Sequence, residues 1–227
     1  MQYAVKSGSA GNTESPSRVS LFEDIVIDGC GLVFEQLAWD DGYKLVAGID
    51  EVGRGCLAGP VVAGACILDG DKPLPKGLND SKQVGPEQRD EIAAELKENC
   101  VAYAIGSVEA GEIDRINILE ATKLAMRLAI AALTPHAPDY ILVDALQLKG
   151  ISVPQRSIIK GDSVSASIAA ASILAKTFRD DLMRSLDAEY PQYGFSGHVG
   201  YATRVHLDAL RTHGPCPLHR MTFRGVV

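Results

Sequence analysis

The feature that most constrains this chain is a pair of adjacent carboxylates at the end of an apolar segment. Residues 45–49 are all apolar or glycine and predict a buried strand, and Asp50 and Glu51 follow at once, before Gly53-Arg54-Gly55. Carboxylates at the end of a core strand cost free energy to desolvate unless their charge is compensated, and a divalent cation is the usual remedy. The two glycines predict a bare backbone that another molecule can approach closely. Acids for metal and a guanidinium for phosphate together predict a metal-dependent enzyme acting on a phosphate ester.

The composition is that of an ordinary globular protein. The chain has 227 residues, enough to bury a full core, and we expect one domain with appendages. No apolar run approaches the ~18–20 residues of a membrane span, and the N-terminus lacks the pattern of a secretory signal. The five cysteines are scattered, without a C-x-x-C pair, which favours reduced thiols. We therefore expect a cytoplasmic protein that does not associate with membranes.

The charge is unevenly distributed. A net charge of −7 argues against a protein that coats nucleic acid non-specifically, but it allows a local basic groove. Residues 201–227 hold a single acid, Asp208, against four arginines and three histidines: Arg204, Arg211, Arg220, Arg224, His206, His213 and His219. The C-terminal end is therefore locally basic on an acidic protein.

The order of elements predicts an α/β fold. Residues 1–19 are rich in Ser, Gly, Asn and Pro and predict a disordered tail, which leaves 20–227 as the domain. A short helix is expected within 21–39. Strands are expected at 44–52, 61–68 and 101–108, with a polar helix at 86–99, and the short first connection favours an antiparallel hairpin. A helix at 118–133, strands at 140–143 and 153–159, and a helix at 163–186 follow. This order predicts a mixed sheet with helices on both faces.

Three further acids are candidate metal ligands. Asp144 ends the apolar strand at 140–143 as Asp50 ends the first, although an Asp at a strand end is often simply solvated. Asp162 is placed to cap the long helix, and Asp180 lies 18 residues further on the same face, ~27 Å away. Only one of these two can join a metal site, and chain geometry leaves the choice open. Lys176, one turn before Asp180, is also placed for a surface ion pair with it.

Two other interpretations of the first motif have to be considered. Residues 53–58 satisfy the dinucleotide-binding pattern G-x-G-x-x-A. That pattern must open a helix, however, and Gly59-Pro60 followed by β-branched residues predicts a strand. Asp50 and Glu51 would also place negative charge beside the pyrophosphate. The second interpretation is a polar hairpin turn with an Arg–carboxylate pair.

The C-terminal motifs have two interpretations each. His213, Cys216 and His219 have the spacing H-x2-C-x2-H, which suits zinc, but the prolines between them suit a rigid turn equally well. Tyr193, Phe195 and Tyr201 lie in or beside a Gly-rich loop, where they either stack on bases and sugars or close the core. Lys82, in the polar loop 78–82, either holds a phosphate or is solvated.

Read together, these segments closely resemble the ribonuclease HII family. The resemblance runs in order from about Leu45 to Phe223 and leaves residues 1 to about 40 outside it. It is carried by segments 50–55, 78–82, Asp144, 160–162, 169–176, Arg179-Asp180, 193–195, His198, Gly200-Tyr201 and 213–220.

The resemblance implies a ribonuclease H-like fold, with a five-stranded mixed sheet flanked by helices and a C-terminal helical extension from about residue 187. It implies cleavage of the RNA strand of RNA–DNA hybrids and nicking of duplex DNA 5′ to embedded ribonucleotides, leaving a 3′-hydroxyl. Two Mg²⁺ or Mn²⁺ ions would be held by the catalytic acids Asp50, Glu51, Asp144 and Asp180. This choice leaves Asp162 a supporting role.

By the same resemblance, Gly53, Arg54 and Gly55 would read the ribose 2′-hydroxyl, and Tyr201 would stack on the adjoining deoxyribose. Lys82 would contact the substrate, and a monomer is expected. The alternative is a catalytically silent hybrid-binding protein on the same fold. Four intact carboxylates argue against it, because pure binding would gain by losing such charge near phosphate.

Overall fold

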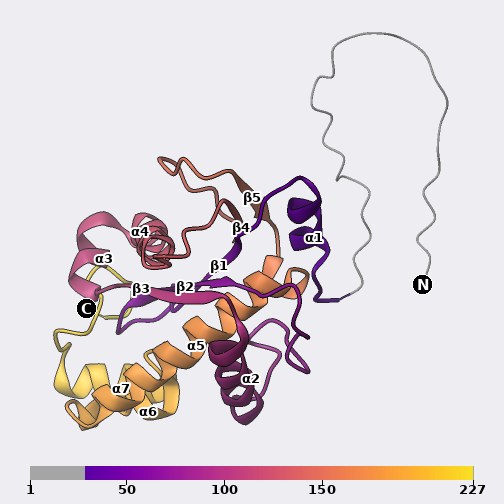
Figure 1. The fold of residues 1–227 in the computed structure, drawn as a ribbon. Coiled ribbons are helices and arrows are strands. Elements are labelled where there is room, and N and C mark those ends of the chain that lie inside the picture. Colours follow the sequence, from indigo (N-terminus) through magenta and orange to yellow (C-terminus); the bar gives the residue numbers. More distant parts are fainter. Residues whose placement is uncertain (1–28, 227) are drawn as a thin grey trace.

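The computed structural model describes residues 29–226, and the predicted tail at 1–19 lies outside this range. One five-stranded sheet runs through the centre, with helices above and below it (Figure 1). The strands are β1 (Val46–Val52), β2 (Val61–Ile67), β3 (Ala102–Val108), β4 (Tyr140–Asp144) and β5 (Gln155–Ile158). The α-helices are α1 (Val33–Asp40), α2 (Pro86–Asn99), α3 (Ala110–Ile116), α4 (Ile118–Ala131), α5 (Ala166–Asp187), α6 (Phe195–His198) and α7 (Arg204–His213). Two 3₁₀ turns complete the list, Gly161–Ser163 and Pro191–Tyr193.

The sheet has the order β3-β2-β1-β4-β5 and is mixed, as the sequence predicts. β1, β2 and β3 pair in antiparallel fashion, which confirms the hairpin, whereas β1–β4 and β4–β5 are parallel. The parallel register sets Ile49 opposite Val143. Asp50 and Asp144 are the next residues of their strands, and the acids therefore meet at the same end of the sheet.

The helices form two layers on the sheet. α3 and α4 cover one face, and α2 and α5 cover the other (Figure 1). α5 lies very close to the sheet: a Cβ atom at Gly48 would stand 2.0 Å from the carbonyl carbon of Ser167, and one at Gly64 would stand 2.3 Å from the Ala171 oxygen. The small residues 169–172 allow this close packing of the helix on the sheet.

The start of the long helix differs from the prediction. α5 begins at Ala166, and its N-cap is Ser165, whose hydroxyl accepts a hydrogen bond from the Ile168 amide. The interpretation of Asp162 as the N-cap is therefore wrong. Asp162 lies in the preceding 3₁₀ turn, because three more residues pass before the backbone becomes helical, and its carboxylate lies 3.6 Å from Lys82 Nζ.

After α5 the chain forms the C-terminal extension that the resemblance implies. The turn Pro191–Tyr193, α6 and α7 pack with the end of α5 around a separate apolar cluster that includes Met183, Phe195 and Leu210. Over residues 29–226, no helix is both long enough and apolar enough to cross a membrane. The predicted helix within 21–39 corresponds to α1 where the structure describes it, and α3 had not been predicted.

Gly48→Ala should lower the free energy of unfolding by about 1–3 kcal/mol, because the new methyl group meets α5 backbone that has to move. Urea denaturation monitored by circular dichroism measures the change. Gly111→Ala is the matched control, since its Cβ would meet no atom within 4 Å. Equal denaturation midpoints for Gly48→Ala and the parent protein would contradict the close packing.

Candidate active site

Three acids lie at the same end of the sheet, and burial raises the pKa of each of them. Asp50 is only 4% exposed, and burial together with the neighbouring Glu51 carboxylate raises its pKa well above the ordinary value. Burial raises the pKa of Glu51 as well, although Arg54 Nη1 lies 3.2 Å from its Oε1. Burial also raises the pKa of Asp144, against the opposing effect of the Gly161 amide, which donates to Asp144 Oδ1 at 2.7 Å. The Oε2 atom of Glu51 is buried without a hydrogen-bond partner.

Asp180 has a different environment. Lys176 Nζ lies 2.7 Å from one of its carboxylate oxygens, and Arg89 Nη1 lies 3.3 Å from the other. The predicted Lys176–Asp180 pair is therefore confirmed, although it is largely buried. Within residues 29–226, no three His, Cys, Asp or Glu side chains are close enough to hold one metal ion together. Asp50, Glu51 and Asp144 lie near enough that, beyond the effect of burial, Glu51 and Asp144 raise the pKa of Asp50, but their carboxylates do not converge on one point. The choice between Asp162 and Asp180 stays a prediction.

A cavity of about 200 Å³ opens beside one of these acids, Glu51. All five residues predicted to bind substrate line it: Gly53, Arg54, Gly55, Lys82 and Tyr201. Its other lining residues are Glu51, Val52, Ser81, Ser172 and Lys176. The Tyr201 ring is 40% exposed, and Lys176 Nζ lies 5.7 Å from its centroid. Acid, base and an accessible aromatic ring therefore meet at one cavity.

The two glycines of the turn have different roles. A Cβ atom at Gly53 would stand 2.2 Å from Arg179 Nε, and its φ of +86° is in the left-handed region. A Cβ at Gly55 would meet no atom within 4 Å. The prediction that both glycines leave the backbone open is therefore wrong for Gly53, which the protein itself packs against. Gly55 is open as predicted. The chain then enters β2 without a helix, which excludes the dinucleotide-binding pattern.

The buried Arg220 side chain binds the backbone carbonyls of this turn. It is fully buried and donates to the carbonyl oxygens of Gly53 at 2.7 Å, Arg54 at 2.9 Å and Gly59 at 2.9 and 3.0 Å. Burial lowers its pKa to about 10, so that it stays protonated at neutral pH. The sequence showed Arg220 only as one basic residue among several, and no spacing marks an arginine that binds carbonyls.

Arg179 holds the neighbouring chain segments in the same way. This arginine is also fully buried, and it donates to the carbonyl oxygens of Pro60 at 2.9 Å, Ala58 at 3.1 Å and Val199 at 2.8 Å. Val199 has a φ of +44°, which is strained for a β-branched residue. The strain lies two residues before Tyr201, in the loop that carries its ring to the cavity.

The C-terminal motifs are mostly internal. Tyr193 and Phe195 are buried, so the core interpretation holds for them, and of the three aromatic residues Tyr201 alone is exposed. His213 is exposed, whereas the ring of His219 hydrogen-bonds to His206 and Cys216. The H-x2-C-x2-H residues therefore do not converge on a zinc ion.

The locally basic C-terminal end is less basic at the surface than the sequence indicates. Arg220 is buried, and Arg204 and Arg211 both form ion pairs with Asp208.

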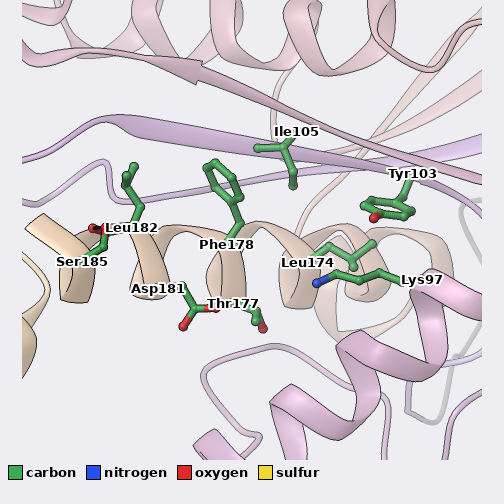
Figure 2. Close-up of a pocket in the computed structure, with 9 residues that line it drawn as sticks. All are labelled: Lys97, Tyr103, Ile105, Leu174, Thr177, Phe178, Asp181, Leu182 and Ser185. Atoms are coloured by element: carbon green, nitrogen blue, oxygen red, sulfur yellow. Dashed lines mark hydrogen bonds between the residues drawn. The ribbon is translucent and has the colours of Figure 1, made fainter.

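A second and larger cavity, of about 540 Å³, lies between β3, α2 and α5. Figure 2 shows its lining, with the side chains of Phe178 and Leu182 on α5 and that of Tyr103 on β3. It shares no lining residue with the smaller cavity, and its single carboxylate, Asp181, is paired with Arg184. The larger cavity is therefore not the candidate site, because Glu51 and the predicted substrate-binding residues line the smaller one.

Known proteins resemble this chain over most of its length. A model of the family described as Ribonuclease HII matches residues 47–226. A ribonuclease HII of Desulfitobacterium hafniense is 54% identical over 192 residues, which cover 85% of this chain and 73% of that protein. A ribonuclease HII of Chlamydia caviae is 55% identical over 195 residues, which cover 86% of this chain and 91% of that protein.

Solved structures show the same fold. The ribonuclease H2 of Pyrococcus horikoshii has a TM-score of 0.65 and 28% identity, and the match covers 81% of this chain and 95% of that one. The structure described as Bst-ribonuclease HIII in complex with Mn²⁺ has a TM-score of 0.62 and 23% identity. The match covers 80% of this chain and 68% of that one. With the family match over residues 47–226 and relatives above 50% identity, this chain belongs to the ribonuclease HII family.

Proposed function

We propose that this chain cuts the RNA strand of RNA–DNA hybrids and nicks duplex DNA 5′ to an embedded ribonucleotide, leaving a 3′-hydroxyl. Family membership makes it a hydrolase and an endoribonuclease that acts on RNA–DNA hybrids. One observation carries the finer proposal: the cavity lined by every predicted substrate-binding residue is also lined by Glu51, the neighbour of the buried Asp50. Recognition and cutting would therefore occur at one place.

We further propose that Asp50, Glu51, Asp144 and Asp180 hold two Mg²⁺ or Mn²⁺ ions. Ribonucleases H depend on divalent metal ions, and the Bst ribonuclease HIII structure is a Mn²⁺ complex. The residues fit in their chemistry, because all four donors are carboxylates, which hard cations prefer, although no three of them converge in the described structure. The raised pKa values and the unpartnered Glu51 Oε2 are what an acid cluster without its cation would show. Bound ions would activate water and stabilise the leaving 3′-oxygen.

The remaining cavity residues suit a nucleic-acid strand. The Lys82 ammonium and the Arg54 guanidinium are exposed enough to meet phosphate oxygens. The open backbone at Gly55 suits close approach to a ribose, whose 2′-hydroxyl is the group that distinguishes RNA from DNA at one position. Gly53 would contribute its backbone to the same turn. The Tyr201 ring would stack on the deoxyribose beside the ribonucleotide and so recognise the junction.

A silent hybrid-binding protein is not favoured. Buried acids with raised pKa values destabilise a fold at neutral pH, since they must ionise away from water. Asp50, Glu51 and Asp144 bear this cost together. A protein that only bound the negatively charged hybrid would be more stable and bind more tightly without them.

We also propose that residues 20–227 act as one catalytic domain, monomeric and cytoplasmic, with residues 1–19 outside it. A single sheet organises the described part of the domain, and the C-terminal extension packs on α5. The five cysteines, all free in the structure, suit a reducing compartment.

Asp144→Asn keeps an oxygen that can accept the Gly161 amide but removes the negative charge. Cleavage of a hybrid should fall by roughly 10³-fold, since metal ions supply several kcal/mol of transition-state stabilisation, while hybrid binding stays measurable. Asp180→Asn should show the same loss. The control is Asp181→Asn, the same charge change at an exposed site beside Asp180. Gel assays of cleavage and fluorescence anisotropy of binding give the two readouts, and near-normal turnover in Asp144→Asn would exclude the proposed metal mechanism.

Tyr201→Ala should lower kcat/KM roughly 5- to 150-fold on a duplex with one embedded ribonucleotide. This corresponds to the loss of about 1–3 kcal/mol of stacking free energy. On a long hybrid the loss should be smaller, because no single junction has to be recognised there. The control is Tyr103→Ala, which removes a tyrosine of equal exposure outside this cavity (41% against 40%). Equal losses on the two substrates would refute the junction-reading role of Tyr201.

A further inference from the structure

Three buried histidines lie beneath the loop that carries Tyr201. His206 is fully buried, His219 is 2% exposed and His198 is 8% exposed. The rings of His198 and His206 stack with their centroids 4.5 Å apart, and Phe195 packs edge-on against both rings. In the part of the chain that the structure describes, no carboxylate hydrogen-bonds to any of these imidazoles. The proposed function leaves this cluster unexplained.

The hydrogen bonds of the cluster assign one tautomer to each ring. The Cys216 amide donates to His219 Nδ1 at 2.9 Å, so Nδ1 bears no proton and Nε2 bears the single proton of a neutral ring. His219 Nε2 then donates to His206 Nε2 at 3.0 Å. This leaves the proton of His206 on Nδ1, which donates to the Tyr201 carbonyl at 2.9 Å. The chain of donors runs in one direction, from Cys216 to Tyr201.

The direction of these hydrogen bonds depends on both the His206 and the His219 ring being neutral. A second proton on His206 would set its Nε2–H against the Nε2–H of His219 across 3.0 Å, and a second proton on His219 would set Nδ1–H against the Cys216 amide across 2.9 Å. Burial lowers the pKa of His206, and burial together with the neighbouring His206 lowers that of His219 to about 4. Both rings are therefore neutral at physiological pH. The Cys216 thiol, whose pKa is raised by burial, also lies 3.2 Å from His219 Nδ1 and can donate to it.

The chain of hydrogen bonds ends at the backbone carbonyl of Tyr201, which lies in an irregular loop. Gly200 and Val199, directly before Tyr201, both have positive φ, so that this loop is not held by regular secondary structure. His198 supports the other side of this loop. The Nδ1 atom of His198 accepts from the Gly200 amide at 3.2 Å, and its Nε2 atom donates to the Tyr193 carbonyl at 2.9 Å. The Tyr201 ring projects from this supported backbone to the cavity.

We propose that His206 and His219 are positioning residues, which act through the Tyr201 carbonyl to hold the Tyr201 ring at the cavity for the ribonucleotide junction. The inference rests on the proposed function of Tyr201 and deepens it. It also gives two residues of the H-x2-C-x2-H motif a role without a metal ion: Cys216 and His219 begin a chain of hydrogen bonds that His206 completes.

Two substitutions at His206 separate positioning from packing. His206→Asn keeps a nitrogen donor where Nδ1 reaches the Tyr201 carbonyl, whereas His206→Gln places its amide near Nε2 and leaves that carbonyl without the side-chain donor. We expect His206→Gln to lower kcat/KM on a single-ribonucleotide duplex on the order of 10- to 100-fold, as misplacement of a contact group does. His206→Asn should retain activity close to that of the parent protein. Equal losses in the two variants would overturn the inference.

A double-mutant cycle tests whether His206 acts through Tyr201. If it does, His206→Gln should cause no further loss in a Tyr201→Ala background. Full additivity, with Tyr201→Ala itself impaired, would overturn the inference and leave the role of Tyr201 intact. A Tyr201→Ala variant with normal activity would remove the proposed role of Tyr201 and the inference with it.

A measurement on the unmutated protein does not depend on whether any variant folds. Nitrogen-15 NMR of the histidine rings at neutral pH should show an unprotonated Nδ1 on His219 and an unprotonated Nε2 on His206. The opposite tautomer on either ring, or a doubly protonated ring, would break the chain of donors and overturn the inference.

Discussion

The candidate site depends on two buried guanidinium groups that bind backbone carbonyls. Segment 53–60, the loop at 199–201 and the C-terminal segment 218–220 are irregular, yet they pack against one another. A few backbone bonds join them, such as Leu57 N to Gly200 O at 2.8 Å and Gly59 N to Leu218 O at 2.8 Å. Buried carbonyls need donors, and an irregular backbone supplies few. Arg179 and Arg220 provide further donors, and removing either would take a charged donor away from three of these carbonyls.

The electrostatics of the site depend mainly on burial. Arg179 and Arg220 donate to neutral carbonyls and form no ion pair with the acids at the end of the sheet. Burial raises the folded-state pKa of Asp50 above its unfolded value, and it raises those of Glu51 and Asp144 as well. Their protonated forms favour the fold, and that stability is lost as the pH rises through the folded pKa values. At neutral pH the metal-free fold bears this cost, which a bound cation would relieve.

Local sequence features predicted much of the fold and the residues of the cavity. Runs of apolar residues ending in Asp50 and Asp144 marked two central strands, and the helix at 86–99 has the predicted bounds. The functions of Arg179, Arg220 and His206 had no local signal. The carbonyls that Arg179 and Arg220 hold lie 20 to 167 residues away in the chain, and only the folded chain brings them together. Gly53 shows the same limit, because its φ and its contact with Arg179 depend on a helix far along the sequence.

The central claim is that the acids and the cavity form one metal-dependent site that recognises a ribonucleotide. Its most direct test is incubation of the full chain with a duplex that contains a single ribonucleotide, with Mg²⁺ or Mn²⁺ and with a chelator. The account predicts one nick on the 5′ side of the ribonucleotide, ending in a 3′-hydroxyl, in the presence of metal only. Cleavage that persists with the chelator, or a metal-dependent cut that ignores the ribonucleotide, would contradict it.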